Sequence, residues 1–329
     1  MLRIYFTNDD IGRVRLATGP DPLWELVLAL QMLRPQTGDL LFTSWRAEAT
    51  DTLRQTGLGR SLRGLLALTP NVGYFPDFLT PAEASGGLEC GLEAIRRTSK
   101  QILLRDISQL GRSRPLPAGA RRVAAGDPDT LVELTSAMRE CYETVVAPYR
   151  HSIETAVGRD LAVRTAALAT GGVEALLHTF RPAAAWSAGE LRVPAHRDQE
   201  LHLDGRGLML IPSYFCVSGP LTMFDPALPP VLIYPVERLP DAYPTRQARP
   251  GALSALIGTT RAAVLQAVRA NPRTTEDLAR RVGISAASAS EHASVLRHAG
   301  LITSRRDRNR MEHFVSPLGL ALLGHQAPP

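Results

Sequence analysis

The most constraining feature of the 329-residue chain is a tight turn between two short helical patterns near its C-terminus. Leu278, Ala279 and Val282 give the first pattern an inner face, and Thr274–Asp277 supplies an N-cap with acidic residues in the first turn. Gly283 is free to adopt positive φ, and Ser285 can cap the second helix, which we expect to run from Ala286 to His298. The segment is therefore predicted to form two helices joined by a short glycine-containing turn.

Strand-like patterns follow the second of these helices. Leu301–Ser304 and Met311–Val315 flank a loop with four arginines, which predicts a β-hairpin, or wing. A further helical pattern, from Leu253 to Val268, precedes the two helices, and a last amphipathic segment covers Pro317–Leu323. Together these elements have the plan of a helix-turn-helix with a wing.

The strings TTEDLARRVGIS and ASASEHASVLRHAGLI, with the wing and the last helix, resemble the winged helix-turn-helix of the ArsR family of bacterial transcription regulators. The resemblance covers about 75 residues, and VLRHAGLI is its most specific part. The long N-terminal region resembles the extensions of actinobacterial members. The resemblance implies a sequence-specific DNA-binding regulator. Founding members sense metals, but here the helix before the recognition helix lacks cysteine and the last helix offers only His325, so we expect no metal.

A recognition helix over 286–298 buries Ala289, Ala293 and Leu296, which lie at i, i+4 and i+7. Its other side chains are then left to meet base edges and phosphates, together with the wing arginines. Glu291 is unusual because phosphate repels a carboxylate, so it either accepts from a cytosine amino group or pairs with arginine. The predicted DNA-binding residues are Thr274, Arg281, Ser285, Ser288, Ser290, Glu291, His292, Ser294, Arg297, Arg305, Arg306, Arg308, Asn309 and Arg310.

The charge of the chain is concentrated in the same region. Residues 246–329 carry twelve arginines and five acidic residues, a net charge of +7, whereas residues 1–245 carry −2 and the whole chain +5. The arginine excess over lysine can reflect genomic coding bias, but its placement favours a nucleic-acid-binding module joined to a different domain. We therefore expect an N-terminal domain over 1–245 and a DNA-binding domain over 246–329, with a possible further boundary at 111–128.

The N-terminal region is expected to be mainly α with a small β-sheet. Helices are predicted over 23–33, 39–55, 59–68, 81–97, 99–110, 129–145 and 148–180, after a short strand at 2–6. The Gly-, Pro- and Arg-rich segment 111–128 is predicted to be a loop. Later strands are expected at 190–193, 199–203, 208–215 and 231–236, and Asp204-Gly205 predicts a hairpin turn between two of them.

Motifs for catalysis are not evident in the sequence. Cys90, Cys141 and Cys216 are widely spaced, and no nucleophile elbow, P-loop, dinucleotide fingerprint or two-histidine zinc motif occurs. His196 and His202 flank acidic residues, but isolated histidines in an exposed turn are more often structural. We expect no enzyme, no cofactor and no metal.

The N-terminal region is far longer than DNA binding requires, so we expect it to dimerise or to sense a small molecule. Aromatic residues that can line an effector pocket are Trp24, Trp45, Trp186, Tyr214 and Phe215, although each is also a plausible core residue. The sequence thus predicts a homodimeric transcription repressor of the cytoplasm and nucleoid that binds double-stranded DNA, with no membrane segment. Two alternatives remain open: an enzyme in 1–245 localised by the winged helix, and a winged helix that binds protein.

Overall fold

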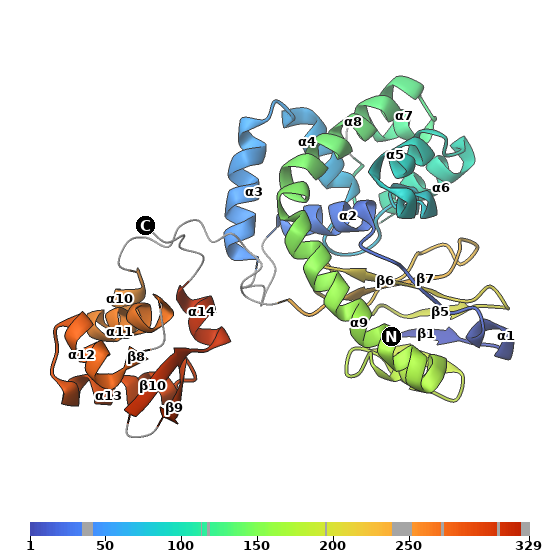
Figure 1. The fold of residues 1–329 in the computed structure, drawn as a ribbon. Coiled ribbons are helices and arrows are strands. Elements are labelled where there is room, and N and C mark those ends of the chain that lie inside the picture. Colours follow the sequence, from blue (N-terminus) through green and yellow to red (C-terminus); the bar gives the residue numbers. More distant parts are fainter. Residues whose placement is uncertain are drawn as a thin grey trace. The chain divides into compact units, whose positions relative to one another are not determined.

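A computed structural model describes residues 1–34, 42–112, 114–116, 119–194, 196–238, 252–270, 273–307 and 310–323 (Figure 1). The chain divides into two compact units, 1–239 and 240–329. The expected boundary between residues 245 and 246 falls in a stretch outside the described residues. Mainly helical structure with small sheets is confirmed for the chain.

Helices form most of the first unit. The longer ones are α2 (Pro22–Met32), α3 (Thr43–Gln55), α4 (Gly59–Leu68), α5 (Leu88–Arg96), α6 (Lys100–Gly111), α8 (Pro128–Val145) and α9 (Arg150–His178). The prediction of one continuous helix over 81–97 is wrong. A 3-10 turn at Ala82–Gly86 precedes α5, and Gly87, with φ +118°, separates the two. The segment 111–128 is not wholly a loop, since Ala120–Ala124 forms α7. The first three residues of the helix expected over 39–55, residues 39–41, lie outside the described residues.

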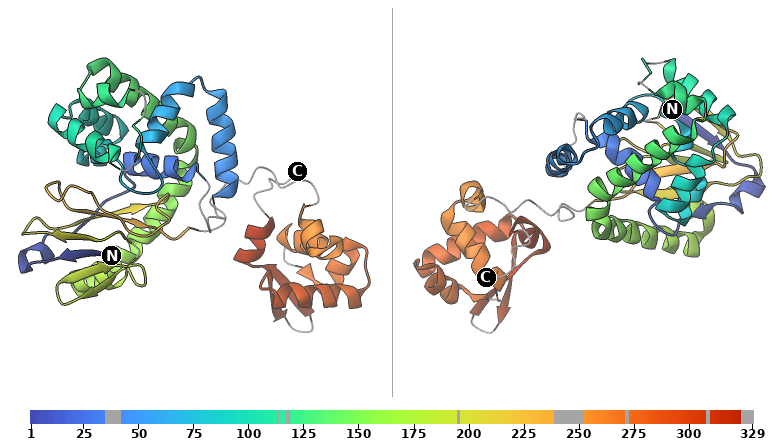
Figure 2. Two further views of the ribbon diagram at one scale, coloured as in Figure 1. Left: turned by 180° about the vertical axis from the view of Figure 1, so that it is seen from behind. Right: turned by 90° about the horizontal axis from the view of Figure 1, so that it is seen from above.

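Strands of this unit form two sheets rather than the single sheet expected. One has the order β3 (Ala185–Ser187), β4 (Glu190–Val193), β1 (Leu2–Tyr5), β5 (Gln199–His202). The other is parallel, with the order β2 (Arg15–Leu16), β6 (Met209–Ser213), β7 (Val231–Pro235). Helices α3–α8 gather at one end of the unit and the strands at the other, and α9 extends along both, as the front and rear views agree (Figures 1 and 2).

The predicted hairpin between β5 and β6 is wrong. The turn itself is present, because Asp204 and Gly205 both have positive φ, +51° and +78°. However, β5 pairs in parallel with β1, and β6 pairs with β2 and β7. The capping box of α1 (Asn8–Ile11) helps to explain this path: Asp10 accepts from Thr7 and, through its Oδ1, from the backbone N–H of Gly207 at 2.8 Å. This bond draws the chain after the turn towards the second sheet.

The second unit is built around one small core. Its elements are α10 (Ala252–Ile257), α11 (Thr259–Ala270), β8 (Arg273–Thr274), α12 (Thr275–Val282), α13 (Ala286–His298), β9 (Ile302–Asp307), β10 (Arg310–Val315) and α14 (Pro317–Leu323). The helix expected from Leu253 to Val268 is broken, because Gly258 has φ +87°. Val264, Leu265, Leu278 and Leu296 are buried at the centre of the core. The short strand β8, which pairs with β10, was not predicted.

Candidate DNA-binding surface

The turn between α12 and α13 is formed by local hydrogen bonds that the sequence predicts. Thr274 caps α12: its Oγ1 accepts from the N–H of Asp277 at 3.2 Å and donates to the Asp277 carboxylate at 2.7 Å. Gly283 adopts the left-handed conformation with φ +73°. Ser285 caps α13 by accepting from the N–H of Ser288 at 3.1 Å. The hydroxyls of Thr274 and Ser285 therefore have structural partners, and their contacts with DNA remain a prediction.

One side of α13 is fixed to the core. Ala289, Ala293 and Leu296 are 0%, 2% and 1% exposed, as predicted. At 100° per residue, the opposite side carries Glu291 and Ser294, which were predicted, and Ala287, Val295 and His298, which were not. Ser290, Glu291 and Arg297 are exposed, whereas Ser288, His292 and Ser294 are partly buried. The outer face is therefore small and weakly charged, and Val295, 42% exposed, adds an apolar surface beside Glu291.

His298 could have been found from helical spacing, since it lies four residues after Ser294 on the same side of α13. Its Nδ1 donates to the backbone carbonyl of Ser294 at 2.8 Å. This bond fixes the imidazole beside the Ser294 side chain, at the end of the face that adjoins Arg297.

The wing has two unlike faces. Residues directly opposite each other in an antiparallel pair lie on the same face. Arg305 is opposite Glu312, so a carboxylate lies on the same face of the hairpin, whereas Arg306 is opposite Met311. Both arginines are exposed. Arg310 pairs with Asp307 in the backbone register, and Arg308 and Asn309 lie outside the described residues.

A histidine that the sequence analysis missed fastens the wing to α12. His313 in β10 is buried, and its two ring nitrogens contact Ser304 Oγ at 2.8 Å and Thr275 Oγ1 at 3.1 Å. Burial lowers the pKa of His313, and the nearby Arg297 charge lowers it further. Side chains alternate between the two faces of β10, so Met311, His313 and Val315 share a face. This alternation was the signal in the sequence that could have predicted a buried His313. A neutral imidazole thus holds the hairpin on the first turn of α12.

Several cations of this unit carry no ion pair. Arg280 lies 3.3 Å from the Asp277 carboxylate, an exposed pair of small energetic weight. Arg281, Arg297, Arg305 and Arg306 form no ion pair with any residue that the structure describes. Unpaired guanidinium groups on an exposed surface are the groups that DNA phosphates attract.

The five aromatic residues predicted to line an effector pocket are all buried, but they do not share one cavity. Trp45 and Phe215 are 4.8 Å apart between ring centroids, and Tyr214 lies beside Phe215. Trp24 packs instead on Phe75, and Trp186 on Phe6. Of the five, only Phe215 lines either of the two pockets described for this unit. Their role in ligand binding remains a prediction.

The buried carboxyl group of Glu25 in the first unit has structural hydrogen bonds. Glu25 accepts from the N–H groups of Tyr214 at 2.7 Å and Phe215 at 3.0 Å, and burial raises its pKa to about 7. Burial also raises the pKa of the Cys141 and Cys216 thiols to about 12. No cluster of three or more metal-ligating side chains occurs among the described residues, and none of the described helices is long and apolar enough to cross a membrane.

Comparison with known proteins agrees with the geometry of the second unit. Residues 259–305, from α11 into β9, match the family of helix-turn-helix domains. No curated protein and no solved structure matches the chain. The ArsR-like helix-turn-helix inferred from the sequence is therefore confirmed for this segment, which carries a domain of the DNA-binding class.

Proposed function

We propose that this protein is a transcription repressor that binds a specific DNA sequence as a homodimer and responds to a non-metal effector. The observation that carries the proposal is the exposed side of α13, which lies within the matched helix-turn-helix domain and adjoins the unpaired cation Arg297. A helix presented in this way fits the major groove, where side chains reach base edges.

The wing supplies the second part of the DNA contact. Arg306 is exposed and lies opposite an uncharged residue in the hairpin, so its charge is available to a phosphate or to the minor groove. His313 supports this role because it holds the hairpin against α12.

Dimerisation follows from the size of the reading surface. One helix of 13 residues contacts few base pairs, and two half-sites on a pseudo-palindrome multiply the specificity. A dimer bound across a promoter would exclude RNA polymerase, so repression is the output that we propose.

We also propose that the activity is binding and not catalysis. The buried carboxylate Glu25 is occupied by backbone N–H groups, and the Cys141 and Cys216 thiols are protonated at neutral pH. These groups fit a binding domain better than a nucleophile or a general base.

The proposal is tested with the DNA upstream of the protein's own gene. The full chain should retard this fragment in a gel, its affinity should fall steeply as salt rises, and it should lower expression from the fragment in a reporter assay. A variant with Arg306, Arg308 and Arg310 replaced by alanine should lose most of this affinity. Full affinity in that variant would exclude the wing from DNA contact, and unchanged or raised reporter expression would contradict repression.

A further inference from the structure

A pocket of about 470 Å³ lies where the chain leaves the parallel sheet of the first unit. One wall of the pocket is the segment from Phe215 to Thr222, which follows β6. A second wall is formed by Leu28 and Met32 of α2. Crevices beyond the carboxyl ends of parallel strands are common ligand sites, and the volume is that of a small-molecule pocket, roughly 300–1,000 Å³.

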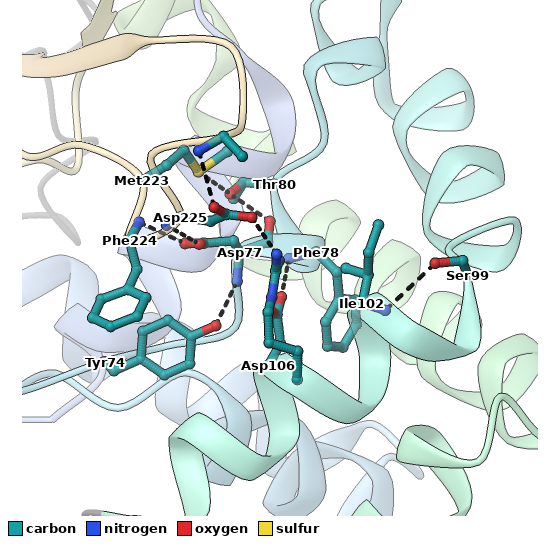
Figure 3. A network of polar contacts seen from close by, with 12 residues as sticks. Tyr74, Asp77, Phe78, Thr80, Ser99, Ile102, Asp106, Met223, Phe224 and Asp225 are labelled. Carbon is teal, nitrogen blue, oxygen red and sulfur yellow. Dashed lines mark hydrogen bonds and ion pairs between the residues drawn. The ribbon is translucent and has the colours of Figure 1, made fainter. Parts of the chain in front are cut away.

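The polar part of this pocket includes a cation stacked on an aromatic ring. The Arg197 guanidinium carbon lies 4.6 Å from the centroid of Phe224. Phe224 in turn packs on Tyr74 at 5.0 Å, and Figure 3 shows these two rings side by side. Arg197 donates to the side-chain carbonyl of Gln199 at 3.2 and 3.1 Å. A stack of this kind holds the guanidinium in a fixed plane.

Arg197 forms no ion pair with a described carboxylate, although acidic residues are close by and the charge of Asp77 acts on it across the pocket. Glu200 pairs with Arg3 at 2.8 Å, and Asp198 with the amino group of Met1. Asp77 faces the same pocket, but its oxygens accept from the N–H groups of Phe224 at 3.0 Å and Asp225 at 2.8 Å (Figure 3). No ion pair joins Arg197 to any described residue. One edge of the exposed Arg197 guanidinium, Nε and Nη2, is thus bonded to Gln199, and Nη1 has no partner among the described residues and can donate to an oxyanion in the pocket.

We propose that this pocket binds a small organic carboxylate with an apolar or aromatic body. Arg197 forms an ion pair with the carboxylate of the ligand. The apolar part of the ligand packs against the side chains of Leu28, Val72, Phe75, Phe215 and Leu221. The ligand is the effector of the repressor proposed above, and this identification alone rests on that function.

The wall of the pocket is also bonded to the residue next to the boundary between the units. Arg238 donates to the backbone carbonyls of Tyr214, at 2.5 Å, and Cys216. Glu25 accepts from N–H groups of the same loop. A ligand that displaces this loop therefore alters the bonds of Arg238, directly before the boundary at Leu239. The other pocket described for this unit, beside α5 and α8, is lined by Glu25 and therefore reaches the same loop, but it contains no guanidinium stacked on an aromatic ring.

The test uses three compounds with one body and different charge: biphenyl-4-carboxylate, biphenyl-4-carboxamide and 4-phenylbenzylamine. Each is titrated into the full chain by calorimetry without DNA, so the result is independent of DNA binding. The carboxylate should bind at least about tenfold more tightly than the amide or the amine, as expected for a charged hydrogen-bonded contact.

Arg197→Gln should abolish this preference, whereas the matched control Arg192→Gln, on an exposed arginine of β4 that pairs with Glu190, should retain it. Ser218→Trp, at an exposed position of the pocket lining, should weaken the binding of all three compounds. The proposal is overturned if the carboxylate gives no heat at millimolar concentration, if it binds no better than the amide, or if Arg197→Gln binds it as the wild type does.

Discussion

At the scale of single residues, Glu291 is the most informative side chain of the DNA-binding unit. It lies at the centre of the outer face of α13, and positions 287, 288, 294 and 295 around it hold no cation. No ion pair to Glu291 occurs among the described residues, so pairing with arginine, one of the two roles considered from sequence, is not observed. Facing DNA, an unpaired carboxylate is favourable only where it accepts from a base, and the cytosine amino group is the major-groove donor that suits it.

We predict that Glu291→Ala relaxes the preference for cytosine at one position of each half-site by about tenfold, because one base contact is worth about 1–3 kcal/mol. The measurement is the affinity for operators that carry each of the four base pairs at every position. Glu276→Ala, an exposed residue in the first turn of α12, is the control for the change in net charge. An equal change of preference in both variants would contradict base reading by Glu291.

At the scale of elements, the register of the wing separates two neighbouring arginines that the sequence treats alike. Arg305 lies beside Glu312 and Arg306 beside Met311. We predict that Arg306→Ala weakens DNA binding and reduces the slope of log affinity against log salt by about 1, the loss of one phosphate contact. Arg305→Ala should have a smaller effect on both quantities. A larger effect of Arg305→Ala would show that the opposite face of the hairpin meets DNA.

The connection between β5 and β6 allows a second matched comparison. Gly205 and Gly207 both have positive φ, but only a Cβ at Gly207 would meet backbone, the carbonyl oxygen of Arg13 at 2.4 Å. Gly205→Ala should cost about 1 kcal/mol for the left-handed conformation. Gly207→Ala should cost a further 1–3 kcal/mol or so, because the Arg13 segment must move.

Urea unfolding followed by tryptophan fluorescence measures this difference in the first unit alone, because Trp24, Trp45 and Trp186 all belong to it. Equal unfolding midpoints for the two variants would contradict the close approach of Gly207 to Arg13.

Local rules predict elements well where their signals lie within the element. The bounds of α4, β4, α13 and α14 agree with the sequence, and so does the buried line of α13, because helical spacing and N-caps act within a few residues. Partners distant in the chain were not predictable. The turn at Asp204 was found, but its local signal cannot specify that β5 joins β1. The breaks at Gly87 and Gly258 were missed because a single glycine is also tolerated inside helices.

At the scale of the whole molecule, the two units differ in net charge, and their exposed arginines can be compared by whether they form ion pairs. The second unit exposes cations without partners, such as Arg297 and Arg306. The first unit instead pairs many of its exposed arginines with acidic residues, as in Arg139–Glu89 at 2.6 Å and Arg192–Glu190 at 2.7 Å. Arg197 is one of several arginines of the first unit that form no ion pair with a described residue, and its place in a pocket beside Phe224 makes it our candidate for the effector site. The proposed division into an effector-binding unit and a DNA-binding unit agrees with this distribution of charge.

The central claim is that the second unit reads a specific DNA sequence. Its most direct test is selection of bound DNA by the full chain from a random library, followed by measurement of affinity for the selected and a scrambled duplex at the same salt concentration. We predict enrichment of a pseudo-palindrome and an affinity at least about 10³-fold tighter for the selected duplex. Absence of enrichment, or equal affinity for the two duplexes, would contradict the claim.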